Sequence, residues 1–143
     1  PSSNFVINHF YKDKMVLAVP YNHYLVNREF SIEELENQTW ISREEGSGTR
    51  EYLNLFLSSN NINAKNIIVF GSNYSVKEAV KNNLGITFIS SLVTKNSLRN
   101  KEISILKTSQ EYTRNFSYIL QKGIIPSKST LVFIDMLKNY IKQ

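Results

Sequence analysis

The chain of 143 residues contains no cysteine. This absence excludes disulfide bonds, thiol catalysis and metal sites built on thiolates, and it is silent about the cellular compartment. No apolar run approaches the roughly 20 residues that a membrane-spanning helix requires, and the first residues lack the features of a signal peptide. We therefore expect a globular domain that does not bind a membrane. A chain that opens on Pro1 and soon reaches strand-like sequence looks like part of a longer protein, and a processed mature protein would look the same.

Catalytic and nucleotide-binding motifs are also missing. His9 and His23 stand apart from each other and from any paired acid. Neither lies on a predicted helix with a second metal ligand three or four residues away. The stretch Gly46–Thr49 lacks the Gly-Lys-Ser/Thr ending of a P-loop and the third glycine of the dinucleotide-binding fingerprint. We expect a binding protein rather than an enzyme, with no metal and no cofactor.

The charge is basic but dispersed. Seventeen Lys and Arg against 12 Asp and Glu leave a net charge of +5, which favours anionic partners in general. No helical stripe of basic residues alternates with aromatics in the manner that tracks a phosphate backbone, so we do not expect this chain itself to bind nucleic acid. The hydrophobic content of 41% is enough for the core of a single domain.

The first half of the chain alternates strand-like and helix-like segments. The apolar run Met15–Val19 ends at Pro20 and predicts a buried strand closed by a turn. Ser31 and Glu34 have the spacing of a capping box and predict the start of a short helix. Next come a predicted strand over Thr39–Ser42 and a predicted helix from about Gly48 to Ser59, with an apolar face formed by Tyr52, Leu53, Leu55, Phe56 and Leu57.

The second half repeats the pattern. Ser75 and Glu78 have capping-box spacing and predict a helix over Val76–Lys81. Alternating strands and helices predict an α/β sheet whose strands are largely buried. The remaining predicted elements are strands over Ile67–Phe70 and Gly85–Ile89, an antiparallel or crossing pair over Ile103–Leu106 and Phe116–Leu120, and a closing amphipathic helix over Ser127–Ile141 with Leu131, Ile134, Leu137 and Ile141 on one face and Phe133, Met136 and Tyr140 beside it.

The segment Trp40–Arg50 is the most informative one. It predicts a strand, a glycine-rich turn and the start of a helix, where unpaired N–H groups and the helix dipole can hold an anion. A structural alternative stays open, because Ser47 is equally suited to be an ordinary helix N-cap. Arg50 opposes the dipole in the first turn, so either a nearby acid such as Glu45 or an anionic ligand neutralises it. The turn at 71–75 also follows a strand, and we expect both turns at the same edge of the sheet.

Taken in order, these blocks resemble the effector-binding domain of LysR-type transcriptional regulators. The resemblance covers most of the chain and rests on the blocks Asp13–Pro20, Ser31–Leu35, Trp40–Arg50, Gly71–Val80, Leu84–Ser90 and Arg114–Phe116. It implies a two-lobed fold like that of type 2 periplasmic binding proteins, with a mixed, mostly parallel sheet flanked by helices. Residues 13–120 would form the second lobe, while residues 1–12 and 121–143 would belong to or join the first lobe.

The resemblance also implies a function and partners. The chain would be the effector-sensing domain of a cytoplasmic, bacterial, homo-oligomeric transcription regulator. Its partner would be a small, anionic effector, and it would reach DNA only through an N-terminal domain that is absent here. The residues that match the family's motifs take their roles from the resemblance. Ser47, Gly48 and Thr49 would contact the effector, and Arg50 would pair with the anion or with an acid of the turn. Ser72 and Asn73 would lie in the neighbouring loop at the edge of the cleft.

Rival functions remain. A fragment of a periplasmic oxyanion-binding protein, for phosphate or a similar ion, would share the lobe architecture and the Ser-Gly-Thr helix start. An α/β enzyme is disfavoured by the missing acid–base and nucleophile pairs. Most of the first lobe has no counterpart in the sequence, so we expect weak effector binding by this chain alone. For the same reason we expect the apolar face of the closing helix to drive self-association.

Overall fold

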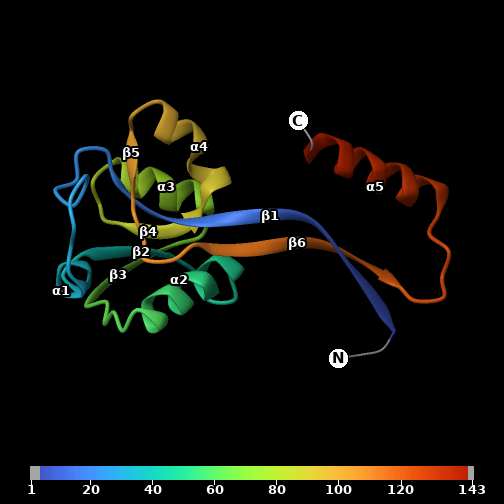
Figure 1. Cartoon of the computed structure of the whole chain (residues 1–143), viewed down its shortest axis with the longest axis horizontal. Helices are drawn as coiled ribbons and strands as arrows, with labels where there is room; N and C mark the ends of the chain where they lie inside the picture. The colour runs from blue at the N-terminus through green and yellow to red at the C-terminus, as the bar shows by residue number, and fades with distance from the viewer. Residues whose placement is uncertain (1–3, 142–143) are drawn as a thin grey trace. The chain divides into compact units, whose positions relative to one another are not determined.

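The computed structural model describes residues 4–141 (Figure 1). The chain forms two compact units. Unit 2 is Lys14–Tyr112, and unit 1 is built from the described residues on either side of it, 4–13 and 113–141. Strand β1 (Phe5–Pro20) leads from unit 1 into unit 2, and strand β6 (Tyr112–Gln121) leads back. Residues 1–3 and 142–143 of the predicted first-lobe segments lie outside the described residues, as does the side chain of Ile141.

The sheet of unit 2 is mixed. β1 runs antiparallel between β4 (Thr87–Ser90) and β5 (Ile103–Leu106). β2 (Thr39–Arg43) pairs in parallel with β3 (Asn66–Phe70), and a parallel bridge between Trp40 and Ile86 joins β2 to the start of β4. Four strands therefore share one direction and β1 alone opposes them, which confirms the prediction of a mixed, mostly parallel sheet.

Helices cover both faces of this sheet (Figure 1). Along each strand, neighbouring side chains point to opposite faces, and the buried residues accordingly fall into two clusters. Leu17, Trp40 and Phe88 belong to the first cluster, together with residues of α2 (Gly48–Ser59). The residues that follow them, Ala18, Ile41 and Ile89, belong to the second cluster, together with residues of α3 (Asn73–Lys81). The predicted arrangement of a sheet flanked by helices is confirmed.

Aromatic stacking defines the first cluster. The rings of Phe56 and Phe88 stack with centroids 4.3 Å apart, and Tyr112 packs edge-on against both, at 5.3 and 5.2 Å. The indole N–H of Trp40 donates to the carbonyl of Leu35 at 3.0 Å, which ties β2 to the short helix α1 (Ile32–Glu36). These contacts fix the positions of α1 and α2 relative to the sheet.

Capping was predicted correctly for α1 and incorrectly for α3. Both bonds of the capping box are present between Ser31 and Glu34. The N-cap of α3, however, is Ser72, whose hydroxyl accepts from the backbone N–H of Ser75 at 3.0 Å. Ser72 has the extended backbone that an N-cap requires, whereas Ser75 already lies inside the helix. Glu78 pairs instead with Lys77 at 2.9 Å.

The prediction of largely buried strands is wrong for β3. Ile67, Ile68 and Val69 are between 40% and 50% exposed. Among the described residues β3 pairs only with β2, so it is an edge strand. On α2, Leu55 is likewise exposed, while Leu53, Phe56 and Leu57 are buried as predicted. Helix α4 (Ser91–Arg99), which directly follows β4, was not predicted from the sequence.

β5 and β6 do not form the predicted pair, because each pairs with β1 instead. In unit 1, β6 lies beside the first half of β1. Asp13 contacts Arg114 at 2.8 Å, His9 contacts Ser117 at 2.7 Å, and the carbonyl of Asn4 accepts from the N–H of Lys122 at 2.8 Å. These partners run in opposite order along the chain, so the two strands are antiparallel.

Helix α5 (Lys128–Ile141) completes unit 1. It confirms the helix predicted over Ser127–Ile141, with a start one residue later. The Ser127 hydroxyl accepts from the backbone N–H of Thr130 at 3.2 Å, as a helix-capping residue does. Much of its apolar surface is exposed within the structure: the side chains of Leu131, Val132, Phe133, Met136 and Tyr140 are each more than half exposed.

The junction of β2 and β4 leaves no room for a side chain at Gly85. A Cβ atom there would stand 2.2 Å from the carbonyl oxygen of Thr39 and 3.0 Å from Cδ1 of Ile41. We expect Gly85→Ala to lower the free energy of unfolding by about 3 kcal/mol, since the backbone must shift. Gly71→Ala is the control, because nothing lies within 4 Å of a Cβ at that position. Urea unfolding of the two variants measures the difference, and equal midpoints would contradict the assigned junction.

Candidate functional site

The two predicted turns lie at the same edge of the sheet. β2 and β3 are parallel and end together, with Arg43 opposite Phe70. Helix α2 begins five residues after Arg43, at a turn in which Gly46 has a φ of +81°. Helix α3 begins after Gly71 and Ser72. Two helix N-termini, each with unpaired N–H groups, therefore occupy neighbouring positions at one edge.

The N-terminus of α2 carries two hydroxyl groups that the fold does not use. Ser47 is the N-cap by its backbone, but its side chain makes no capping hydrogen bond. Thr49 is only 7% exposed, and the structure gives its hydroxyl no hydrogen-bond partner among the described residues. Every fully buried side-chain oxygen or nitrogen in the described part of the chain has a partner. The Thr49 hydroxyl must therefore reach the surface of the turn.

Arg43 connects the two turns, and sequence reasoning did not assign it a role. Its guanidinium donates two hydrogen bonds to the carboxylate of Glu44, both at 2.7 Å, and a third to Oδ1 of Asn73 at 2.6 Å. The hydrogen bonds from Arg43 lower the pKa of Glu44 to about 2, and the same bonds raise the pKa of Arg43. The only signal in the sequence was a charged residue at the end of a predicted strand.

Arg50 turns back toward the loop before α2. It donates to the carbonyl of Arg43 at 3.3 Å and lies 3.6 Å from a carboxylate oxygen of Glu45. Glu45 is 90% exposed, so this ion pair is weak. Glu45 is therefore one group near Arg50 that can offset its charge, as the first of the two alternatives from the sequence expected.

Ser72 and Asn73 differ from Ser47 and Thr49, because their side chains are already engaged. The Ser72 hydroxyl caps α3 and also lies 2.8 Å from the hydroxyl of Ser75. Asn73 accepts from Arg43. The structure thus brings all the predicted site residues to one edge, with the unused hydroxyls on α2 and the engaged polar groups on α3.

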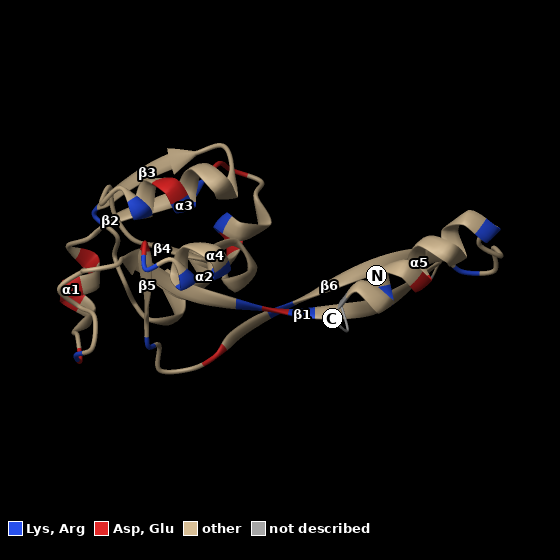
Figure 2. Ribbon diagram, turned by 90° about the horizontal axis from the view of Figure 1, so that it is seen from above, with Lys and Arg blue, Asp and Glu red and all other residues tan. Residues whose placement is uncertain are grey.

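The two arginines at this edge already face acids, since Arg43 pairs with Glu44 and Arg50 lies near Glu45, and Glu51 adds a further carboxylate in the first turn of α2. Lys and Arg are also spread over many elements of unit 2 rather than gathered at one place (Figure 2). An anion would therefore be held by backbone N–H groups, hydroxyls and the helix dipoles more than by net charge.

The histidines take structural positions. His23 hydrogen-bonds to Gln38 at 3.2 Å, and burial lowers the pKa of its imidazole. Nδ1 of His9 lies 2.7 Å from the Ser117 hydroxyl. Among residues 4–141, no group of three or more His, Asp or Glu side chains could hold a metal ion. Within the same residues, no helix has both the length and the apolar character to cross a bilayer.

The arrangement is that of an α/β lobe with two helix N-termini at one sheet edge, and sequence comparison identifies its family. Residues 1–142 match the LysR substrate binding domain. The chain is 43% identical over 140 residues to the HTH-type transcriptional regulator CysL of Bacillus subtilis, covering 96% of this chain and 47% of that protein. The chain therefore belongs to the LysR substrate-binding domain family.

Solved structures agree with this fold. The regulatory domain of Synechocystis CcmR in complex with 2-PG has a TM-score of 0.80 at 23% identity, over 98% of this chain and 69% of that chain. The effector-binding domain of QuiR in complex with shikimate has a TM-score of 0.75 at 18% identity, over 97% of this chain and 66% of that chain. The likeness confirms the predicted fold class of LysR effector-binding domains.

The Arg43–Glu44 pair predicts a pH dependence. The pKa of Glu44 is about 2 in the folded protein against an ordinary value of 4.5. Such a carboxylate contributes stability above pH 4.5 and loses that contribution as the pH falls to about 2. We expect the stability difference between the wild-type protein and Glu44→Gln to shrink over this range, as measured by urea unfolding at a series of pH values. Glu45→Gln, at an exposed carboxylate, is the control, and a difference for Glu44→Gln that stays constant with pH would contradict the pairing.

Proposed function

We propose that unit 2 is the effector-binding second lobe of a LysR-type regulator, and that a small anion binds at the N-terminus of α2. The observation that carries the proposal is the pair of unused hydroxyls, Ser47 and Thr49, beside the unpaired N–H groups of the first helical turn. Gly48 lets a ligand approach the backbone closely, since nothing lies within 4 Å of a Cβ at this position.

The remaining site residues have supporting roles in this proposal. Arg50 contributes positive charge beside the first turn of α2, within 3.6 Å of Glu45. Ser72 and Asn73 form the rim, and Asn73 holds Arg43 in place through the 2.6 Å hydrogen bond. The proposed second lobe covers residues 13–120. Its compact part is Lys14–Tyr112, and the flanking residues lead into the segments that would join the first lobe.

The chain spans about half the length of CysL, so the activity of the whole protein is also a proposal. According to this proposal, this chain senses the effector in the bacterial cytoplasm, and a separate N-terminal domain binds DNA. Two structurally similar domains, those of CcmR and QuiR, form complexes with 2-PG and shikimate, respectively. A periplasmic oxyanion-binding protein is the less favoured alternative, because the family match and the relatives are those of LysR-type regulators.

Titration of this chain with sulfate, phosphate, shikimate and 2-PG tests the proposal. With one wall of the site present, we expect dissociation constants on the order of 1 mM for the anions that bind. Ser47→Ala and Thr49→Val should each weaken binding about tenfold, since each removes a hydrogen bond to a charged ligand. Isothermal titration calorimetry measures the change.

Ser58→Ala is the matched control, because Ser58 lies in the last turn of the same helix and its hydroxyl bonds the carbonyl of Leu55 at 3.1 Å. Equal affinities in all three variants would overturn the proposed position of the ligand. Micromolar binding by the wild-type chain would contradict the expectation that a single wall binds weakly.

We further propose that the protein is a homo-oligomer and that the chain self-associates through exposed apolar surface. Phe133 and Met136 on α5 are 65% and 64% exposed, and a second apolar surface lies on the edge strand β3. Phe133→Glu should lower the weight-average mass measured by sedimentation equilibrium. Ile68→Glu reports on β3, and Leu98→Glu is the control at an exposed leucine on α4, outside both of these surfaces. A monomeric wild-type chain at high concentration would contradict the proposal.

A further inference from the structure

Unit 2 contains a hollow far from the N-terminus of α2. It has a volume of about 620 Å³ and lies between the segment from Arg28 to Leu35, the C-terminal end of α2 and the segment Lys107–Ser109. Volumes of this size are typical of small-molecule sites. α2 has 12 residues, so its two ends are roughly 18 Å apart. The hollow shares no lining residue with the proposed effector site.

The floor of the hollow is apolar. Leu35, Phe56 and Ile62 line it, and each belongs to the first core cluster with 6% exposure or less. Phe30, which is half-buried and packs on the same cluster, forms a side wall. A ligand that reaches this floor would contact aromatic and branched side chains, which favours an apolar ligand body.

The rim divides into engaged and unengaged polar groups. Arg28 pairs with Glu34 and donates to the carbonyl of Tyr24, and the Asn60 amide donates to the carbonyl of Phe56 and to the hydroxyl of Tyr112. In contrast, Lys107 has no ion-pair partner and Ser109 no side-chain hydrogen bond within the described part of the chain. Glu29 also lines the hollow and has no ion-pair partner among residues 4–141. The groups left available are one cation, one hydroxyl and one carboxylate.

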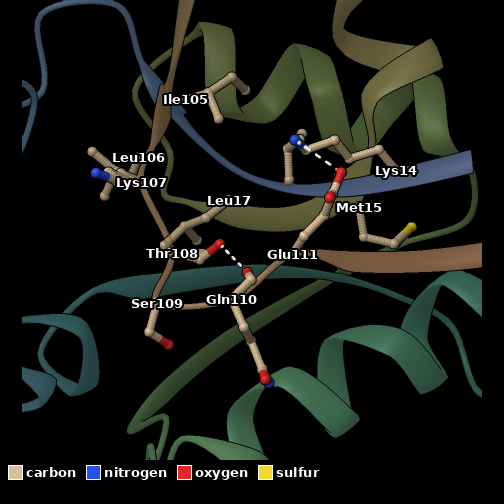
Figure 3. A pocket seen from close by; sticks show the side chains of 11 residues that line it. Lys14, Met15, Leu17, Ile105, Leu106, Lys107, Thr108, Ser109, Gln110 and Glu111 are labelled. Carbon is tan, nitrogen blue, oxygen red and sulfur yellow. Dashed lines mark hydrogen bonds and ion pairs between the residues drawn. The ribbon is translucent and has the colours of Figure 1, made fainter.

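Lys107 and Ser109 also line a smaller hollow of about 280 Å³, shown in Figure 3. Within that hollow Lys14 and Glu111 pair with each other at 3.2 Å, so these two charges are satisfied and Lys107 is left without an ion pair among the described lining residues. In the view of Figure 3, the side chains of Lys107 and Ser109 extend away from this ion pair. They are therefore available to a ligand in the larger hollow. A third hollow, on α5, is lined by residues of that helix alone and has no opposing wall.

We propose that the larger hollow is a second small-molecule site, which takes a carboxylate with an aromatic or branched apolar body. The apolar body would rest on Leu35, Phe56 and Ile62, and the carboxylate would pair with Lys107 and accept from Ser109. The Lys107 ammonium and the Ser109 hydroxyl are both hydrogen-bond donors, as a carboxylate requires. Glu29 favours a ligand that also carries an amine, such as an apolar amino acid.

The probe is 3-phenylpropionate, compared with its uncharged analogue 3-phenyl-1-propanol. Trp40, the single tryptophan, bonds Leu35 at 3.0 Å and lies 6.1 Å from the ring of Phe56, so its fluorescence reports on the floor of the hollow. Lys107→Gln should weaken binding of the acid about tenfold and leave the alcohol unchanged. Lys95→Gln, at a lysine on α4, is the matched control.

Several outcomes would overturn the proposal. No fluorescence response to either probe would exclude the site, and an equal effect of Lys107→Gln on acid and alcohol would exclude pairing with the carboxylate. Loss of binding in the Thr49→Val variant would place the acid at the proposed effector site instead. Phenylalanine is the second probe. Weaker binding of phenylalanine, but not of 3-phenylpropionate, in Glu29→Gln would support an amino acid, whereas no change would assign the site to simple carboxylates.

Discussion

The two backbone hydrogen bonds between β2 and Ile86 organise the whole of unit 2. Ile41 donates to the carbonyl of Ile86 at 2.7 Å, and Ile86 donates to the carbonyl of Thr39 at 2.9 Å. They join the β2–β3 pair to the strands around β1, so that both core clusters extend through one sheet. They also fix the direction of β2 and β3 relative to β4. α2 and α3 begin at one edge of this sheet. The position of that edge therefore depends on the contact between β2 and Ile86, which lies on the side of β2 opposite β3.

Local sequence signals predicted most of the fold, because strand periodicity and capping act over a few residues. The run Met15–Val19 and the capping box at Ser31 are examples. Ser72 and Ser75 could each have been the N-cap of α3. The capping-box spacing alone predicted Ser75, whereas the N-cap is Ser72. The exposure of β3 could not be predicted, because an apolar edge strand and an apolar buried strand have the same composition.

The candidate site, like the fold, has some features that local sequence predicts and others that depend on residues far apart in the chain. A glycine-rich turn before a helix indicates backbone anion binding from local sequence, and this signal made Ser47 to Arg50 candidate site residues. The Arg43–Asn73 hydrogen bond joins residues 30 positions apart and depends on the parallel register of β2 and β3. The larger hollow has walls from three separate segments, and its unengaged groups are recognised only once the partners of Arg28 and Asn60 are known.

The composition of unit 1 from two distant stretches of chain has a consequence for folding order. Asp13 and Arg114 are separated by 101 positions and His9 and Ser117 by 108. Closing so long a loop in a disordered chain carries a large entropic cost, which disappears once residues 14–112 have already folded and drawn the two stretches together. Residues 4–13 are synthesised before residues 14–112, yet we expect them to acquire their native neighbours only after that longer segment has folded.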